Sequence, residues 1–115
     1  MLIDKKTRKI ICTHVRELSH MWQKAIGLMF SKGISDDVCY FFSFSSPRRM
    51  HLHMFFVYFP IDVIFLDSQM KVVELARLHP WRLYTSSVPA QYFIEVNAGL
   101  VRKRKIKIGD ELERY

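Results

Sequence analysis

This chain has few cysteines, glycines and prolines, and it has no hydrophobic run long enough to cross a membrane. Its most apolar stretch, residues 54–66, is interrupted by Pro60 and Asp62 and is shorter than the ~20 residues that a bilayer-spanning helix needs. The N-terminal residues become polar at once, which is not typical of a secretory signal. Cys12 and Cys39 lack the spacing of a zinc ribbon or a redox motif, so we expect both to be reduced and mostly buried. These absences predict a cytoplasmic protein with no membrane partner.

The sequence also lacks the local motifs of several enzyme classes. It has no glycine-rich phosphate loop, no Gly-x-Ser-x-Gly elbow and no His-Glu-x-x-His zinc helix. Neither cysteine has the sequence context of a nucleophile. Catalytic groups can assemble from distant positions, so these absences do not exclude an enzyme. They favour a non-catalytic role, and we expect no cofactor.

What the sequence does contain indicates one folded domain over residues 1–115. Half of its residues are apolar and 14% are aromatic, which is enough for a hydrophobic core and argues against disorder. The formal net charge is +7, from 18 basic and 11 acidic residues. Such an excess favours an anionic partner such as RNA, DNA, a phosphorylated metabolite or an acidic protein patch, and it also serves solubility.

The hydrophobic pattern is mainly that of β-strands. Alternating or continuously apolar segments predict strands over residues 9–13, 39–45, 50–59, 62–67, 71–78 and 91–97. Residues 46–49 predict a turn, and the two prolines in residues 79–90 predict an irregular loop. One short helix is expected near residues 20–27. The predicted fold class is mainly β (α+β at most): a compact, antiparallel, partly barrel-like sheet of about five to seven strands.

Several short signatures occur in a fixed order along the chain. They are Ala25-Ile26-Gly27-Leu28-Met29, Phe42-x-Phe44, His53-Met54, Pro60-Ile61-Asp62-Val63-Ile64-Phe65-Leu66-Asp67, Val72-Val73, Phe93-Ile94-Glu95-Val96-Asn97-Ala98-Gly99 and Ile108-Gly109-Asp110. In this order they resemble the DUF192 family, also called the UPF0127 group, over residues 16–112. The resemblance implies a small β-rich, partly barrel-like domain. It implies no reaction, because the family has no established chemistry.

This chain departs from the commoner pattern of the family at one place. Where many members read Phe-Trp-Met-Lys-Asn-Thr, this chain has Leu52-His53-Met54-Phe55-Phe56-Val57. A polar patch is thereby replaced by apolar residues, which resembles an archaeal subgroup. We therefore do not expect this chain to have a site of the kind that the Lys-Asn-Thr groups could build elsewhere.

Four polar residues are candidates for a small-ligand site: Asp62, Glu95, Asn97 and His53. Glu95 and Asn97 share a predicted strand face with Phe93, and a carboxylate, an amide and an aromatic ring together can recognise a small polar ligand. The favoured interpretation of the two polar residues is that they face solvent at the end of a strand. Asp62 lies in an apolar segment, where a carboxylate must be paired or hydrogen-bonded. It either caps a turn after Pro60, which is the favoured interpretation, or pairs with Glu95 as a general acid and base.

A metal site is a weaker hypothesis. His51 and His53 are two residues apart on a predicted strand, so both side chains project to one side and can supply two zinc ligands. The other donors would come from His79, Glu95 or Asp62. Histidines on the solvent face of a half-buried strand are the favoured interpretation, and we assign no metal.

A basic run near the C-terminus is the candidate nucleic-acid site. It contains Arg102, Lys103, Arg104, Lys105 and Lys107. If the run is extended, its three lysines form a row on one face that can follow a phosphate backbone. Trp81, Tyr84 or Tyr92 could then stack on unpaired bases. A solvated surface strand is the favoured structural interpretation.

Three functions therefore remain open, in this order. The sequence favours a non-catalytic binding module for a small polar ligand or a macromolecular partner. The alternatives are a nucleic-acid-binding protein that uses the basic run and a small metal-assisted hydrolase. An aromatic surplus at Phe55, Phe56, Tyr58 and Phe59 permits either a monomer or a homodimer.

Overall fold

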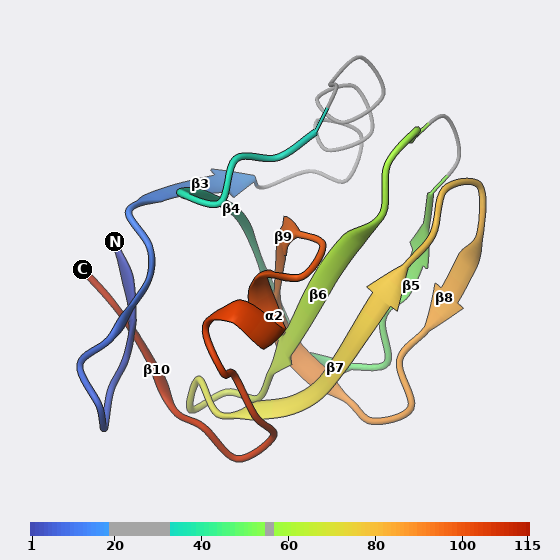
Figure 1. Cartoon of the computed structure of the whole chain (residues 1–115). Coiled ribbons are helices and arrows are strands. Elements are labelled where there is room, and N and C mark those ends of the chain that lie inside the picture. The colour runs from blue at the N-terminus through green and yellow to red at the C-terminus, as the bar shows by residue number, and fades with distance from the viewer. Residues whose placement is uncertain (19–32, 55–56) are drawn as a thin grey trace.

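The computed structural model describes residues 1–18, 33–54 and 57–115. In these residues, ten strands form three sheets beside one short helix (Figure 1). The mainly β fold predicted from the sequence is confirmed, whereas the helix expected near residues 20–27 lies outside the described residues. None of the helical structure in the described ranges is long and apolar enough to span a bilayer.

The central sheet has five strands in the order β3-β4-β9-β6-β7. Its strands are β3 (His14–Leu18), β4 (Val38–Arg48), β6 (Ile61–Leu66), β7 (Val72–Leu78) and β9 (Ala90–Asn97). The β3–β4 pair is parallel and the other pairs are antiparallel. In the described part of the chain, β3 and β7 are opposite edges, so the sheet does not close into a barrel. Every residue of β6 is buried, which explains why the strand is apolar except at Asp62.

Two smaller sheets complete the fold. The first has the order β10-β1-β2, from β1 (Leu2–Asp4), β2 (Ile10–Cys12) and β10 (Leu112–Arg114). The second pairs β5 (His51–His53) with β8 (Leu83–Thr85). Because β1 pairs with β10, the two chain ends lie side by side (Figure 1). The amino group of Met1 donates a hydrogen bond to a main-chain oxygen of Tyr115 at 2.9 Å.

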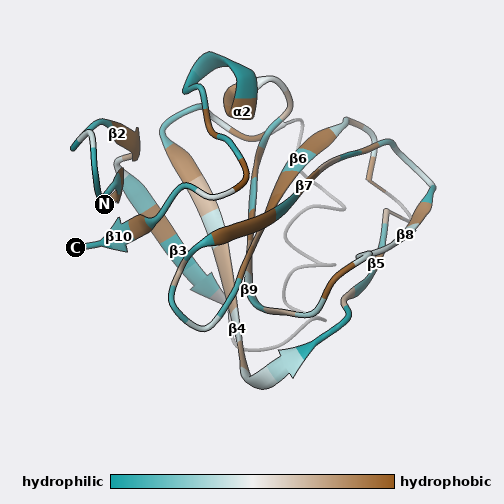
Figure 2. Cartoon of the chain, turned by 90° about the horizontal axis from the view of Figure 1, so that it is seen from below, coloured by the Kyte–Doolittle hydropathy of each residue, from teal (hydrophilic) through white to brown (hydrophobic). Residues whose placement is uncertain are grey.

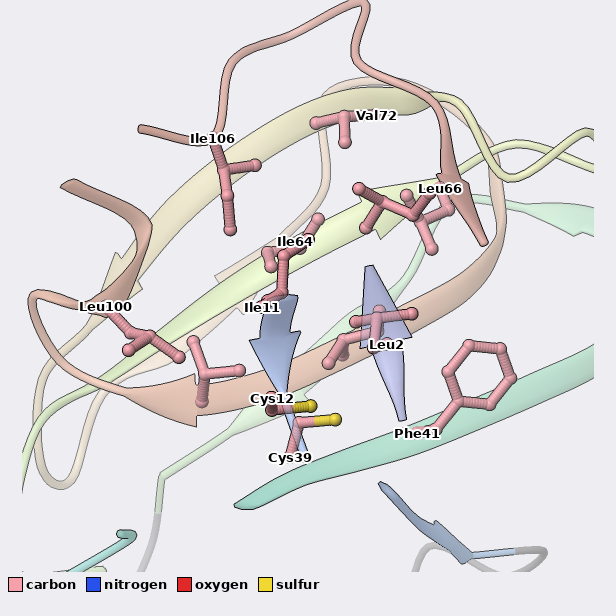
Figure 3. Close-up of a cluster of buried hydrophobic side chains, with 13 residues drawn as sticks. Leu2, Ile11, Cys12, Cys39, Phe41, Ile64, Leu66, Val72, Leu100 and Ile106 are labelled. Carbon is pink, nitrogen blue, oxygen red and sulfur yellow. The ribbon is translucent and has the colours of Figure 1, made fainter. Parts of the chain in front are cut away.

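The core lies on both faces of the central sheet. On one face, alternate residues of β6 and β9, such as Ile64 and Val96, pack against Leu2 of the three-stranded sheet (Figure 3). On the other face, Phe65 and its neighbours pack against Leu52 of the two-stranded sheet. Figure 2 shows the hydrophobic stretches running along β6 and β7. Because successive side chains of a β-strand point to opposite faces, each face of the central sheet contributes to a hydrophobic core of its own.

The local hydrophobic pattern predicted the wrong bounds for strands whose extent depends on pairing with another strand. The turn predicted over residues 46–49 is wrong, because β4 continues to Arg48 through an irregular stretch in which the missing N–H of Pro47 breaks no regular ladder. The single strand predicted over residues 50–59 is limited, in its described residues, to His51–His53. This segment pairs with Leu83–Thr85, which lies in the predicted loop over 79–90.

The basic run is also not extended. Residues Leu100–Lys103 form the short helix α2, and Lys105 has a left-handed φ of 56°. The predicted row of lysines on one strand face is therefore wrong. Strands β1, β3 and β10 have no prediction from the sequence, because each is short and exists only through its partner strands.

Glu74, on β7, is a buried carboxylate that holds the segment after β8. Its Oε1 accepts hydrogen bonds from the backbone N–H groups of Ser87 (2.7 Å) and Val88 (3.2 Å), and its Oε2 accepts one from the hydroxyl of Tyr84. Burial of Tyr84, together with this hydrogen bond and the charge of Glu74, raises the pKa of the phenol to about 12.

We therefore expect the free energy of unfolding to decrease as the pH rises from 10 to about 12. In this interval the phenol of Tyr84 loses its proton in the unfolded chain and keeps it in the folded chain, so the folded state binds more protons. The measurement is the urea midpoint of wild type and Tyr84→Phe across this interval. The stability advantage of the wild type should shrink with rising pH, and a constant difference would contradict the assignment.

Candidate functional site

A cleft of about 640 Å³ lies between the β1–β2 turn and the segment that joins α2 to β10. Its lining contains six cationic side chains: Arg8, Lys9, Lys103, Arg104, Lys105 and Lys107. Two carboxylates, Asp4 and Asp110, also lie on its wall. We call this feature the basic cleft. Its two walls come from opposite ends of the sequence and are brought together by the pairing of β1 with β10.

The first wall is a tight turn stabilised by Asp4. The Asp4 carboxylate accepts hydrogen bonds from the backbone N–H groups of Lys6 (2.9 Å) and Thr7 (3.0 Å). The backbone closes with Arg8 N–H on the Asp4 carbonyl at 2.8 Å, and Arg8 has a φ of 64°. The Asp4 carboxylate therefore stabilises its own turn. The lysine and arginine residues of this turn are exposed to solvent.

The second wall is the coiled basic run. The N–H of Arg104 donates to the carbonyl of Leu100 at 2.8 Å, and that of Ile106 donates to the carbonyl of Val101 at 2.9 Å. Leu100 and Ile106 are buried and anchor the segment to the core. The Asp110 carboxylate accepts the N–H of Lys107 at 2.9 Å. Because the segment curls, four of the five basic residues that the sequence indicates converge on one cleft.

The fifth residue of the run, Arg102, lies elsewhere. It lines a separate hollow with Asp62 and Arg77. Arg8 and Lys9 are cleft residues that the sequence prediction missed. The signal was present, because four of residues 5–9 are basic, but only the pairing of strands distant in sequence places this turn beside the C-terminal run.

The cations of the basic cleft differ in how far they are neutralised. Arg8 pairs with Glu113 at 2.9 Å, Lys103 pairs with Asp36 at 2.7 Å, and the Nε of Arg104 donates to a backbone carbonyl at 3.3 Å. The remaining three, which have no ion pair with any residue in 1–18, 33–54 or 57–115, are Lys9, Lys105 and Lys107. All three are exposed. The cleft therefore presents uncompensated positive charge to solvent.

The Asp62 carboxylate is hydrogen-bonded by groups of the fold itself. The residue is 4% exposed, and its carboxylate accepts hydrogen bonds from the N–H groups of Gly99 (2.8 Å) and Val101 (3.4 Å) and from the Nε of Arg77 (3.0 Å). Gly99 is the N-cap residue of α2, so Asp62 supplies the acceptor that the first helical N–H groups need. The sequence predicts a cap for a turn after Pro60, whereas the carboxylate caps α2.

The register of β6 and β9 separates Asp62 from Glu95. Asp62 lies opposite Val96, and Glu95 lies opposite Val63. Opposed residues of antiparallel strands share a face, and successive residues alternate between faces. Glu95 is therefore buried on the other side of the central sheet, and the two carboxyl groups are not placed to act as an acid–base pair.

Asn97 lies on the same face of β9 as Glu95, because it is two residues further along the strand. The Nδ2 of Asn97 donates to Asp36 Oδ1 at 2.8 Å, and the other oxygen of Asp36 accepts from Lys103. These two hydrogen bonds, of which the one from Asn97 has the larger effect, hold the pKa of the Asp36 carboxyl below its usual value. His53 is exposed on β5 in the two-stranded sheet. The structure thus does not bring the four small-ligand candidates together.

The histidines of β5 show no metal-binding arrangement. His51 and His53 are both exposed, and the Nδ1 of His51 lies 3.1 Å from Thr85 Oγ1. Among the residues that the structure describes, no group of three or more His, Cys, Asp or Glu side chains could hold a metal ion. The proposed further donors, His79 among them, do not gather around β5.

The three candidate stacking residues do not line the basic cleft. Trp81 makes an edge contact with Tyr58, with ring centroids 5.8 Å apart. Tyr84 stacks on Phe65, and Tyr92 lies against Phe41. Stacking on unpaired bases therefore gains no support within the described part of this cleft.

Comparison with known proteins gives one consistent family. The DUF192 model, described as "Uncharacterized ACR", matches residues 3–114. A UPF0127 protein of Thermococcus sibiricus is 34% identical over 113 residues, covering 98% of this chain and 73% of the relative. A UPF0127 protein of Pyrococcus furiosus is 35% identical over 109 residues, covering 91% of this chain and 90% of the relative. Both source organisms are archaea.

Two solved structures have the same fold. One, from Sinorhizobium meliloti 1021, is described as a "putative transcription regulator"; it has a TM-score of 0.84 and 28% identity, and the match covers 97% of this chain and 88% of that one. The other, a protein of unknown function from Novosphingobium aromaticivorans, has a TM-score of 0.77 and 25% identity, and the match covers 87% of this chain and 74% of that one.

Proposed function

This chain belongs to the DUF192 family, and on that premise we propose that it is a non-catalytic domain that binds nucleic acid through the basic cleft. The observation that carries the proposal is the convergence of six cationic side chains, from both ends of the chain, on one cleft of about 640 Å³. The resemblance that the sequence shows to the family is confirmed, and it brings no established reaction.

The charge distribution favours an extended phosphate polymer. A second hollow, which shares Asp4, Thr7 and Asp110 with the basic cleft, adds Lys5, Lys6 and Lys71 to its lining together with Glu111, which pairs with Lys5 at 3.9 Å. Positive side chains thus continue beyond the volume that one small anion would fill. Lysine and arginine side chains that neutralise successive phosphates supply most of the affinity in sequence-independent nucleic-acid binding.

The structural neighbour from Sinorhizobium meliloti adds support of a second kind. Its description as a "putative transcription regulator" concerns that protein, with which this chain shares 28% identity across nearly the whole domain. A regulator of that class acts on nucleic acid, which is the ligand chemistry that the basic cleft suits.

The other two functions receive less support. A small polar ligand at these four candidates would need Asp62, on one face of the central sheet, to act together with Glu95 and Asn97 on the other face and with His53 of the two-stranded sheet. A metal-assisted hydrolase would need further donors near His51 and His53, and the described residues do not provide such a cluster.

We expect labelled single-stranded and duplex oligonucleotides to bind with an affinity that falls steeply with salt. If about four phosphates are neutralised, raising the salt from about 50 to about 200 mM should weaken duplex binding by about 100-fold. Fluorescence anisotropy of the intact chain is the measurement. Absence of binding at low salt, or binding that ignores salt, would contradict the proposal.

A competition experiment distinguishes a polymer from a small ligand. Pyrophosphate and ATP are added to the bound oligonucleotide at equal total phosphate concentration. We expect the oligonucleotide to remain bound, because the small anions contact only part of the positive surface. Complete displacement would assign the basic cleft to a small phosphorylated ligand instead.

A further inference from the structure

The two cysteines of the chain face each other across the boundary between two sheets. Cys12 ends β2 in the three-stranded sheet, and Cys39 is near the start of β4 in the central sheet. They are 1% and 0% exposed, and they belong to one core cluster. Figure 3 shows their sulfur atoms side by side, and each thiol shifts the pKa of the other more than any other group does.

Nothing in a hydrophobic core requires two thiols to meet. A buried free cysteine packs as a small apolar side chain. One cysteine beside another small apolar residue would therefore fill this part of the core equally well. No ladder connects β2 with β4 in the described part of the chain, but the residues just after Cys12 are already tied to the start of β4, because the N–H groups of Thr13 (3.1 Å) and His14 (2.9 Å) donate to the carbonyl of Asp37. A covalent bond between the two thiols would add a constraint that persists when these hydrogen bonds break on unfolding.

We propose that Cys12 and Cys39 form a reversible disulfide that fastens the three-stranded sheet to the central sheet when the chain meets an oxidising low-molecular-weight disulfide. The cysteines are free thiols in this structure, and their sulfur atoms lie side by side in the core (Figure 3), where a cross-link needs little rearrangement. The bond would close the loop formed by residues 13–38.

The chemistry is two successive thiol–disulfide exchanges. The thiolate of Cys12 attacks one sulfur of the external disulfide, which forms a mixed disulfide and releases one external thiolate. The thiolate of Cys39 then attacks the Cys12 sulfur and releases the second. Two protons leave the cysteines and two external thiols are formed, so the external disulfide is reduced as the protein is oxidised.

The order of attack follows from the surroundings of the two thiols. The hydrogen bond from Cys39, aided by the N-terminal ammonium group and the Arg104 guanidinium, lowers the pKa of the Cys12 thiol. The same hydrogen bond and burial raise the pKa of Cys39. Cys12 is therefore the first nucleophile. Its access comes from local opening of β2, an edge strand whose ladder with β1 spans only three residues.

The test compares the thiol–disulfide equilibrium of the folded and unfolded chain. The wild-type protein is equilibrated with mixtures of reduced and oxidised glutathione, in native buffer and in concentrated guanidinium chloride, and the oxidised fraction is read by mass spectrometry. We expect the equilibrium constant for the intramolecular bond to be at least about 100-fold larger in the folded chain. An equal or smaller constant in the folded chain would overturn the proposal.

The bond is located and its effect is measured independently. Non-reducing tryptic digestion of the oxidised protein should yield residues 10–16 linked to residues 33–48. Oxidised wild type should unfold about 10 °C above the reduced form, because the cross-link restricts the unfolded chain. Cys12→Ser, the matched control, should show no change in unfolding temperature on oxidation. An oxidised wild type that unfolds at or below the temperature of the reduced form would also overturn the proposal.

Discussion

Replacing Lys9, Lys105 and Lys107 together with glutamate is expected to weaken oligonucleotide binding by at least about 100-fold at about 100 mM salt. These three side chains are exposed and have no ion pair with the described residues, so their charge is available to a phosphate backbone. The slope of affinity against salt should also fall by about three, one for each lost phosphate contact. Anisotropy titrations at several salt concentrations measure both effects.

A matched control separates the basic cleft from the net charge of the protein. Arg16, Arg82 and Arg102 are exposed cations outside the cleft, and changing them to glutamate alters the net charge by the same amount. We expect this variant to keep its affinity within about 3-fold at the same salt. An equal loss in both variants would show that the basic cleft is not the binding surface. Thermal unfolding of each variant checks that the fold is retained.

Replacing Asp62 with alanine is expected to lower the free energy of unfolding by about 3 kcal/mol. The buried carboxylate accepts two backbone N–H groups at the start of α2 and the Nε of Arg77, and alanine leaves the N–H groups without this acceptor. For a domain of this size, such a loss lowers the unfolding temperature by about 10 °C. Chemical denaturation and calorimetry measure the change.

Arg77→Gln provides the control for this prediction. The Arg77 side chain is half exposed, so its replacement removes a solvent-screened ion pair and leaves Asp62 bonded to the helix start. The variant should be much closer to wild type than Asp62→Ala. If the two variants lose the same stability, the ion pair rather than the helix cap is the main role of Asp62. If the free energy of unfolding of Asp62→Ala equals that of the wild type, the Asp62 carboxylate does not stabilise the start of α2 either.

The two predictions also separate ligand binding from folding. Asp62 lies outside the lining of the basic cleft but holds α2, from which Lys103 enters it. At a temperature where Asp62→Ala is folded, its oligonucleotide affinity should fall far less than that of the lysine variant. The small-ligand hypothesis places Asp62 in a binding site, whereas the observed hydrogen bonds give it a structural role.

Strands with a complete pattern of their own were predictable from the sequence. The residues of β6 are apolar except for Asp62, and those of β9 carry their polar side chains at alternate positions, so each segment has a strand pattern of its own, although Glu95 is buried like its neighbours. The hairpin of β6 with β7 followed from the short connection between them. The short strands β5 and β8 were not predictable in this way, because three residues carry no period and pair across a separation in sequence.

The sequence by itself determined the fold class, the family and the excess of positive charge. It did so because these depend on composition, on local periodicity and on the order of short motifs, all of which are properties of neighbouring residues. The tertiary structure alone decided which charges act together. Pairing of β1 with β10 brings Arg8 and Lys9 to the curled C-terminal run, and the β6–β9 register turns Asp62 and Glu95 to opposite faces. Contacts between segments far apart in sequence leave no local pattern, so only the folded chain reveals them.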